Sequence, residues 1–168
     1  MKKPILILLV VFGFFGLAQA QSSSIGLRLS ASLLFNVVYT YNFEAPNQGF
    51  AARAYLGATL LPNGNGATGA IGGGAEGIYR APIGGLSSVY FGLGASAVYV
   101  SNGNTNPNSS FPSTYFGGLV YFLAGVEVGL GENLALSFDI QPLSYAITPF
   151  FSNLSTIPLF ALSLAYRF

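Results

Sequence analysis

The 168-residue chain contains no cysteine, no histidine and no tryptophan. Without cysteine it can form neither a disulfide nor a lipoprotein anchor. Without histidine and cysteine it also lacks the Ser–His and Cys–His nucleophile pairs and the usual ligands of transition metals. Only pairs of carboxylates remain for acid–base chemistry. These absences predict a protein that is not an enzyme and that carries no cofactor.

Charge is also scarce. Charged residues make up 7% of the chain and hydrophobic residues 52%, with a mean hydropathy of +0.58. These values are typical of membrane proteins, yet beyond the first 20 residues no run reaches the ~18 uninterrupted apolar residues of a spanning helix. Only helices and closed barrels satisfy every backbone group in hydrocarbon. The composition therefore favours a β-barrel.

The N-terminus indicates export. Lys2 and Lys3 precede an uncharged apolar run at 5–17, and Ala18-Gln19-Ala20 supplies the small residues that signal peptidase accepts. We expect a signal peptide at 1–20 and a single barrel domain at 21–168. A retained membrane anchor is disfavoured because the run is shorter than the ~20 residues needed to span a bilayer. The 148 residues from Gln21 onward (168 − 20) carry four arginines and five carboxylates, a net charge of −1 that offers nothing to nucleic acid.

Alternation of apolar with small or polar residues recurs in eight segments, as expected for strands with one lipid-facing side. These segments are 24–33, 37–44, 50–61, 70–80, 87–100, 114–128, 134–141 and 162–168. In the first, Ile25, Leu27, Leu29, Ala31 and Leu33 are expected to face outward. Short turns alternate with longer loops that start at Pro62, Ser101 and Pro142, although the connection at 34–36 is short for an outer loop. The pattern predicts an all-β fold, an eight-stranded antiparallel up-and-down transmembrane β-barrel.

Two alternatives remain around Pro142. Proline has no backbone N–H to give to a ladder, so the seventh strand either ends there or forms a bulge before Leu143, Tyr145 and Ile147. If the segment 142–156 forms a further hairpin, the barrel would have ten strands.

The last strand carries the clearest local signature. Leu162, Leu164, Tyr166 and Phe168 share one face, and the sequence stops at the aromatic residue. With the signal peptide, the alternating strands and the Gly-Glu-Asn turn at 131–133, this end resembles the small bacterial outer-membrane β-barrel proteins, the class of OmpX and the OmpA transmembrane domain. The resemblance implies a bacterial outer-membrane location, contact with outer-membrane lipid, and a terminal strand read by the barrel-assembly machinery. Without tryptophan, an aromatic girdle must use tyrosine and phenylalanine, such as the tyrosines at 39, 79, 99 and 166.

Most charges of the barrel fall on the inward faces of predicted strands. They are Arg28, Glu44, Arg53, Glu76, Arg80, Glu127, Asp139 and Arg167. A charge buried in a narrow lumen needs a partner, so we expect an ion-pair network. Arg28 and Arg167 are expected to lie close together near one mouth, with Glu44 or Glu127 as their counter-ion.

The predicted outer loops carry no charge and consist mainly of Asn, Ser, Thr, Gly and Pro with some apolar stretches. We expect them to face a phosphate-poor surface or another envelope protein, or else to be neutral solvated loops with no specific role. The sequence thus favours a structural or envelope-interaction protein with a lumen filled by side chains. The alternative is a narrow passive pore for water, ions or very small solutes, with room supplied by inward glycines at 57, 72, 74, 92 and 94.

Overall fold

The computed structural model describes residues 22–31, 33–63, 66–102, 114–147, 152–155 and 159–168. Their regular structure consists of β-strands. The strands are β1 (Ser23–Ser30), β2 (Phe35–Asn42), β3 (Gly49–Asn63), β4 (Gly66–Gly84), β5 (Ser87–Asn102), β6 (Thr114–Gly129), β7 (Leu134–Ile147), β8 (Ser152–Ser155) and β9 (Leu159–Arg167). Among these residues no helix is long and apolar enough to cross a membrane. The signal peptide expected at 1–20 lies outside them and stays a prediction.

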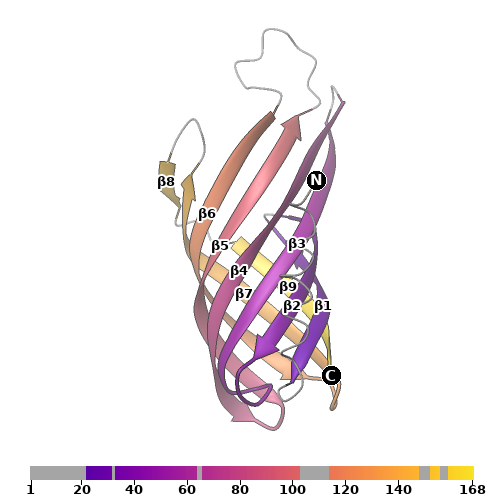
Figure 1. Ribbon diagram of the computed structural model, residues 1–168, viewed down its shortest axis with the longest axis vertical. Helices are drawn as coiled ribbons and strands as arrows, with labels where there is room; N and C mark the ends of the chain where they lie inside the picture. Colours follow the sequence, from indigo (N-terminus) through magenta and orange to yellow (C-terminus); the bar gives the residue numbers. More distant parts are fainter. Residues whose placement is uncertain (1–21, 32, 64–65, 103–113, 148–151, 156–158) are drawn as a thin grey trace, which may run out of the picture.

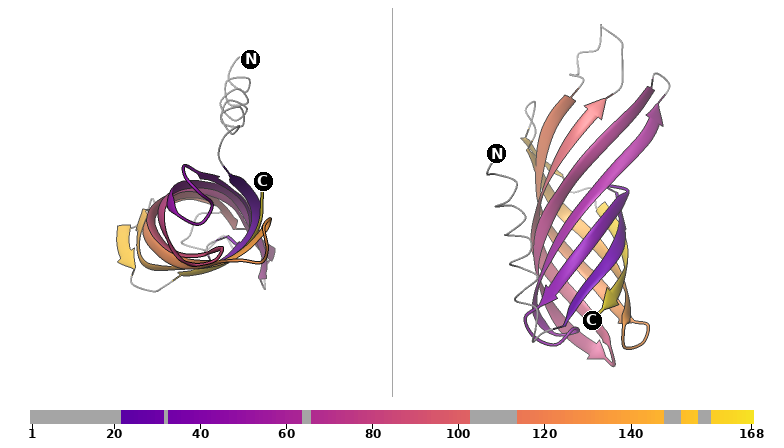
Figure 2. Two further views of the ribbon diagram at one scale, coloured as in Figure 1. Left: turned by 90° about the horizontal axis from the view of Figure 1, so that it is seen from below. Right: turned by 45° about the vertical axis from the view of Figure 1, so that its right-hand side comes forward.

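Eight antiparallel strands, β1 to β7 and β9, close into a barrel (Figures 1 and 2). Each strand pairs with its neighbour in the chain, and β9 pairs with both β7 and β1. The seam is completed by the amides of Ser23 and Phe168, each of which donates to the other residue's carbonyl oxygen, at 3.0 and 2.9 Å. The predicted eight-stranded barrel is confirmed and the ten-strand alternative is wrong. We call the end that holds the C-terminus the inner end, and the opposite end the outer end.

The segment after Pro142 is not the loop that the sequence analysis expected. β7 continues through the proline to Ile147, and its last four residues, Ser144–Ile147, pair with β8. Figure 1 shows β8 beside the outer end of β7. The segment thus lengthens β7, and the short strand β8 pairs with its end without adding a strand to the closed barrel.

A β-bulge accommodates Pro142. Phe122 pairs with Leu143 and Ala124 with Ile140, so Leu123 faces both Gln141 and Pro142. Pro142 is the extra residue of the bulge, where its missing N–H costs no ladder hydrogen bond. Because one residue is added, the residue numbers that face outward change from even to odd. Before the bulge even-numbered apolar residues face outward, and after it odd-numbered ones do. The bulge is one of the two outcomes predicted for this proline.

The other predicted boundaries shift by a few residues. β3 and β4 extend far into the loop expected at 62–69, leaving only residues 64 and 65 between them. In contrast, β1 and β2 have 8 residues each, against 15 in β3 and 19 in β4. The wall is therefore lower on the side of β1 and β2, as the right-hand view of Figure 2 shows.

Leu33 lies in this low part of the wall and corrects another expectation. It was expected to face outward, but β1 ends at Ser30 and the leucine turns inward, only 3% exposed. The Ser30 hydroxyl donates to its carbonyl oxygen at 2.6 Å, and the Asn36 amide donates to the same oxygen at 2.8 Å. The alternation fails because the chain is turning and no longer follows a strand.

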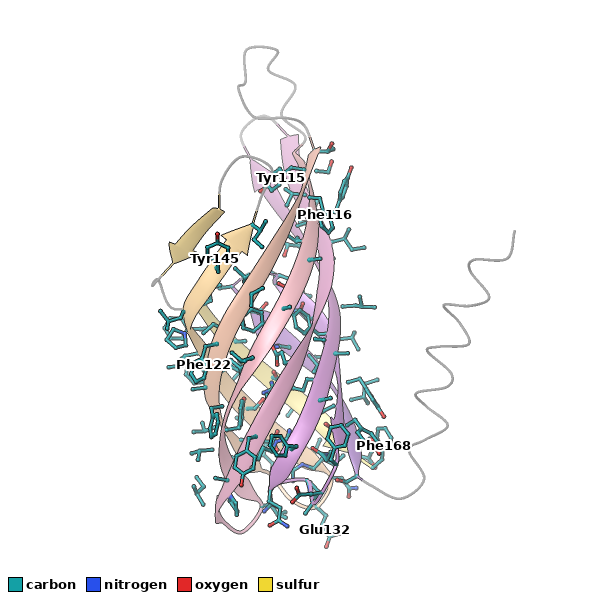
Figure 3. All side chains as sticks on the ribbon, turned by 60° about the vertical axis from the view of Figure 1, so that its left-hand side comes forward. Tyr115, Phe116, Phe122, Glu132, Tyr145 and Phe168 are labelled. Atoms are coloured by element: carbon teal, nitrogen blue, oxygen red, sulfur yellow. The ribbon has the colours of Figure 1, made fainter. Side chains whose placement is uncertain are left out.

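The exterior is apolar and the interior holds the polar and charged residues, the reverse of a soluble protein. Tyr79, Tyr99 and Tyr166 are exposed on the outside, and Tyr39 is half-buried with its hydroxyl bonded to Ser23. Figure 3 shows Phe116 near the outer end and Phe168 near the inner end, both on the exterior.

Candidate functional site

The register of the sheet builds the lumenal site in rows. Arg53, Glu76, Gly94 and Tyr121 are successive cross-strand partners on β3, β4, β5 and β6. Paired residues on one face lie about 5 Å apart at Cβ. The row therefore places the Arg53 Nε beside the Glu76 Oε2, at 3.3 Å.

Two arginines and two carboxylates form a central quartet across the lumen. Arg28 from β1 reaches Glu76 at 2.7 Å and Asp139 of β7 at 3.1 Å. Arg53 contacts the same two carboxylates, with 3.4 Å between its Nη1 and the Asp139 Oδ2. No side chain of the quartet is more than 4% exposed. Each buried charge thus has two opposite charges beside it, as burial in a low dielectric requires.

Three tyrosines complete this layer. The Tyr121 hydroxyl donates to Glu76 at 2.8 Å and lies 2.9 Å from the Tyr55 hydroxyl, while Tyr90 donates to Asp139. The Arg28 guanidinium lies 5.3 Å from the centre of the Tyr55 ring, and that of Arg53 lies 4.7 Å from the Tyr90 ring. These are cation–π distances. The quartet and the three tyrosines form one connected cluster.

A second cluster lies nearer the inner end. Glu127 sits between Arg167, at 2.8 Å, and Arg80, at 3.4 Å. Arg80 also donates to the side-chain oxygen of Asn42. The backbone amide of Arg167 donates to Asn133 in the β6–β7 turn at 2.7 Å, which fixes this cluster at the inner mouth.

The structure brings seven of the eight predicted residues into these two clusters and leaves Glu44 out. Glu44 is exposed, and among the described residues it has no salt bridge. β2 ends at Asn42, and the Phe43 amide bonds to Phe50 across the β2–β3 turn, so the inward alternation stops before Glu44.

The expectation that Arg28 lies close to Arg167 near one mouth is also wrong. Arg28 pairs in the β1–β9 ladder with Ser163, four residues before Arg167. This offset carries Arg28 to the central quartet. Glu127, one of the two counter-ions considered, is the one that binds Arg167.

The tyrosine–glycine pairs were not predicted from the sequence. Tyr55 is paired with Gly74, Tyr121 with Gly94, and Tyr90 with Gly125. At each of these glycines a Cβ would collide with the ring or hydroxyl of its tyrosine. The room that glycine leaves on the inward face is therefore taken by aromatic rings. A sequence signal existed, since an inward tyrosine opposite an inward glycine can be found once the register is assigned.

The described residues contain no group of three or more acidic side chains able to hold a metal ion. Glu76 and Asp139 are each occupied by arginines and a tyrosine. The arrangement links strands across the lumen and occupies the carboxylates of Glu76, Glu127 and Asp139.

No protein-family model matches the chain. No curated protein matches it either. Among solved structures, a major outer membrane protein from Thermus thermophilus has a TM-score of 0.51 at 14% identity, covering 89% of this chain and 100% of that one. The outer membrane protein Ail of Yersinia pestis has a TM-score of 0.45 at 18% identity, covering 88% and 97%. The outer membrane enzyme PagL has a TM-score of 0.43 at 11% identity, covering 87% of this chain and 97% of that one.

At these identities the likeness concerns the fold and carries no activity. The likeness to the Thermus structure and the closed eight-stranded topology of this chain together confirm the predicted fold class, the outer-membrane β-barrel. The chain has the fold of the small outer-membrane β-barrel proteins.

Proposed function

We propose that this protein is a non-enzymatic structural barrel of the bacterial outer membrane that interacts with other envelope components and has a lumen closed by its own side chains. The observation that carries the proposal is the extent of the two clusters. Every barrel strand contributes to one of them, β2 through Asn42 and β9 through Arg167. The side chains thus tie the whole wall together from within.

The lumen has little room for a permeant ion. An eight-stranded barrel encloses only enough space for side chains or one small ligand. Here arginines and tyrosine rings occupy that space at the level of the central quartet, including the room left by Gly94. An ion passing this level would have to separate buried charge pairs, and breaking each pair costs about 3–5 kcal/mol.

The same contacts argue against catalysis. Acid–base work by a carboxylate pair requires that substrate reach both groups. Glu76 and Asp139 are both buried and hold arginines on two sides. The fold itself does not decide this point, because one fold supports many functions.

Planar-bilayer recordings of the refolded protein test the closed lumen. We expect no steady unitary conductance from barrels whose folding is verified by a heat-dependent shift in gel mobility. Unitary steps that change when Glu76→Gln or Asp139→Asn neutralises a lumenal carboxylate would contradict the proposal and support a narrow pore.

One observation favours that second function. On the inner side of the quartet, the side-chain oxygens of Ser88 and Ser163 are buried without a hydrogen-bond partner in the structure. Such groups usually bind ordered water. A water-filled inner lumen would conduct only if it passed the central quartet, so the recordings above distinguish the two functions.

A further inference from the structure

A cavity of about 200 Å³ lies in the lumen next to the central quartet and its three tyrosines, toward the outer end. We call it the outer cavity. Tyr55, Ser96, Leu119 and Ala146 line it, and they belong to one row of cross-strand partners that passes through Gly74. This row lies one inward position further out than the row of Arg53, Glu76 and Tyr121. The pair of tyrosine hydroxyls therefore separates the cavity from the charges.

The lining of the outer cavity is mostly apolar, with the Ser96 hydroxyl as a polar exception. Leu33, Val98 and Leu119 supply aliphatic groups, while Tyr55 and Tyr115 supply rings. A buried water needs two to four polar partners, and genuinely apolar cavities stay dry. This cavity is therefore better suited to an apolar occupant than to water.

Small residues keep the cavity open. At the level of the quartet, tyrosine rings take the room beside Gly94 and Gly125. One level further out, the inward positions on β5 and β7 are Ser96 and Ala146, which fill little of the lumen. On the low side of the wall, the buried Leu33 turns inward from the β1–β2 connection and closes the lining there.

We propose that the outer cavity binds one small apolar molecule, about the size of a single alkyl-substituted aromatic ring. An apolar cavity of about 150 Å³ holds benzene, so about 200 Å³ suits a ring of the size of toluene. The charged layer beneath gives such a molecule no onward path. The site therefore holds its ligand and does not transmit it to the inner end.

Toluene titrated into the barrel in lipid nanodiscs tests this site by methyl NMR. We expect the methyl signals of Leu33 and Leu119 to shift and to saturate. The outward methyls of Leu27 and Leu56 serve as an internal control, since toluene dissolved in the bilayer shifts them without saturation. If the inward and outward methyls respond alike, or the inward ones do not respond, the proposal is wrong.

A matched pair of variants sharpens the test. Ala146→Phe places a ring in the cavity, whereas Ile147→Phe places the same ring on the exterior of the same strand. Saturation at Leu33 should disappear in the first variant and persist in the second. If Ala146→Phe does not fold, Ser96→Leu fills the same row from β5. Saturable binding that survives in a folded cavity-filling variant would overturn the assignment.

Discussion

Single lumenal residues differ sharply in how far they depend on their partners. Asp139 is 0% exposed and touches two arginines and a tyrosine, whereas Glu132 lies exposed in the β6–β7 turn. Both are carboxylates of the same chain, and only the first is needed to balance buried charge.

Replacing Asp139 with asparagine preserves its shape and leaves Arg28 and Arg53 sharing only Glu76. Breaking a buried ion pair costs about 3–5 kcal/mol because a charge stays buried without compensation. We expect the free energy of unfolding to fall by about that amount, measured by urea titration of the barrel in lipid. Glu132→Gln is the control, with an expected change within about 0.5 kcal/mol. Equal effects of the two variants would show that the quartet does not stabilise the fold.

Gly94→Ala tests whether glycine is required beneath Tyr121. The added Cβ would collide with the ring, and overpacking of this kind costs about 1–3 kcal/mol. Gly77→Ala on β4 is the control, because nothing lies within 4 Å of a Cβ there. In a Tyr121→Ala background the cost of Gly94→Ala should largely vanish. A cost that is unchanged in this double-mutant cycle would contradict direct packing between the two residues.

At the scale of elements, β7 and β9 are the strands that complete the barrel. β7 carries the bulge at Pro142, and β9 forms the seam with β1. Both features set which side chains face inward, because a shift of one residue exchanges the two faces of a strand.

Deleting Pro142 should therefore leave the two faces of β7 unchanged. Without the extra residue, Gln141 alone faces Leu123, and Leu143 still faces Phe122 with its side chain toward lipid. We expect this variant to keep the heat-dependent gel shift of a folded barrel. Deleting Pro142 and Leu143 together would turn Tyr145 inward and Ser144 and Ala146 toward lipid, so this variant should lose the shift. If the double deletion folds as well as the single one, the alternation along the outer part of β7 is not needed for folding.

Phe168→Asp should impair assembly into the membrane. The side chain is exposed on the exterior, while its backbone makes both seam hydrogen bonds with Ser23, so the substitution leaves those bonds available. An assembly defect would then arise from the changed side chain and not from a broken seam. Phe168→Tyr is the matched control. The measurement is the fraction of folded barrel in isolated outer membranes, and normal insertion of the aspartate variant would show that the terminal aromatic residue is not an assembly signal.

For the molecule as a whole, alternation and composition predicted the fold, the strand number and the inward position of seven charges. They failed where the chain leaves a strand, at Leu33 and Glu44, because alternation has no meaning within a turn. The alternation also did not predict that Arg28 binds Glu76 and Asp139, because the offset between β1 and β9 depends on closure of the barrel. The tyrosine–glycine pairs depend on register in the same way, and register between strands is a property of the assembled sheet.

The distribution of charge leads to a prediction for the whole surface. All four arginines of residues 22–168 are buried in the lumen, and lysine occurs only at positions 2 and 3. The described exterior therefore presents no cation to the phosphates of lipopolysaccharide. We expect purified barrel to bind lipopolysaccharide weakly, with an affinity that does not change as salt is raised, because screening acts only where charges attract.

Ser101 and Thr114 face each other at the exposed outer ends of β5 and β6, which provides a gain-of-function control. The double variant Ser101→Arg/Thr114→Arg should acquire tighter binding that weakens as salt increases. Binding of the unmodified barrel that is tight and sensitive to salt would contradict the phosphate-poor outer surface that the uncharged loops predict.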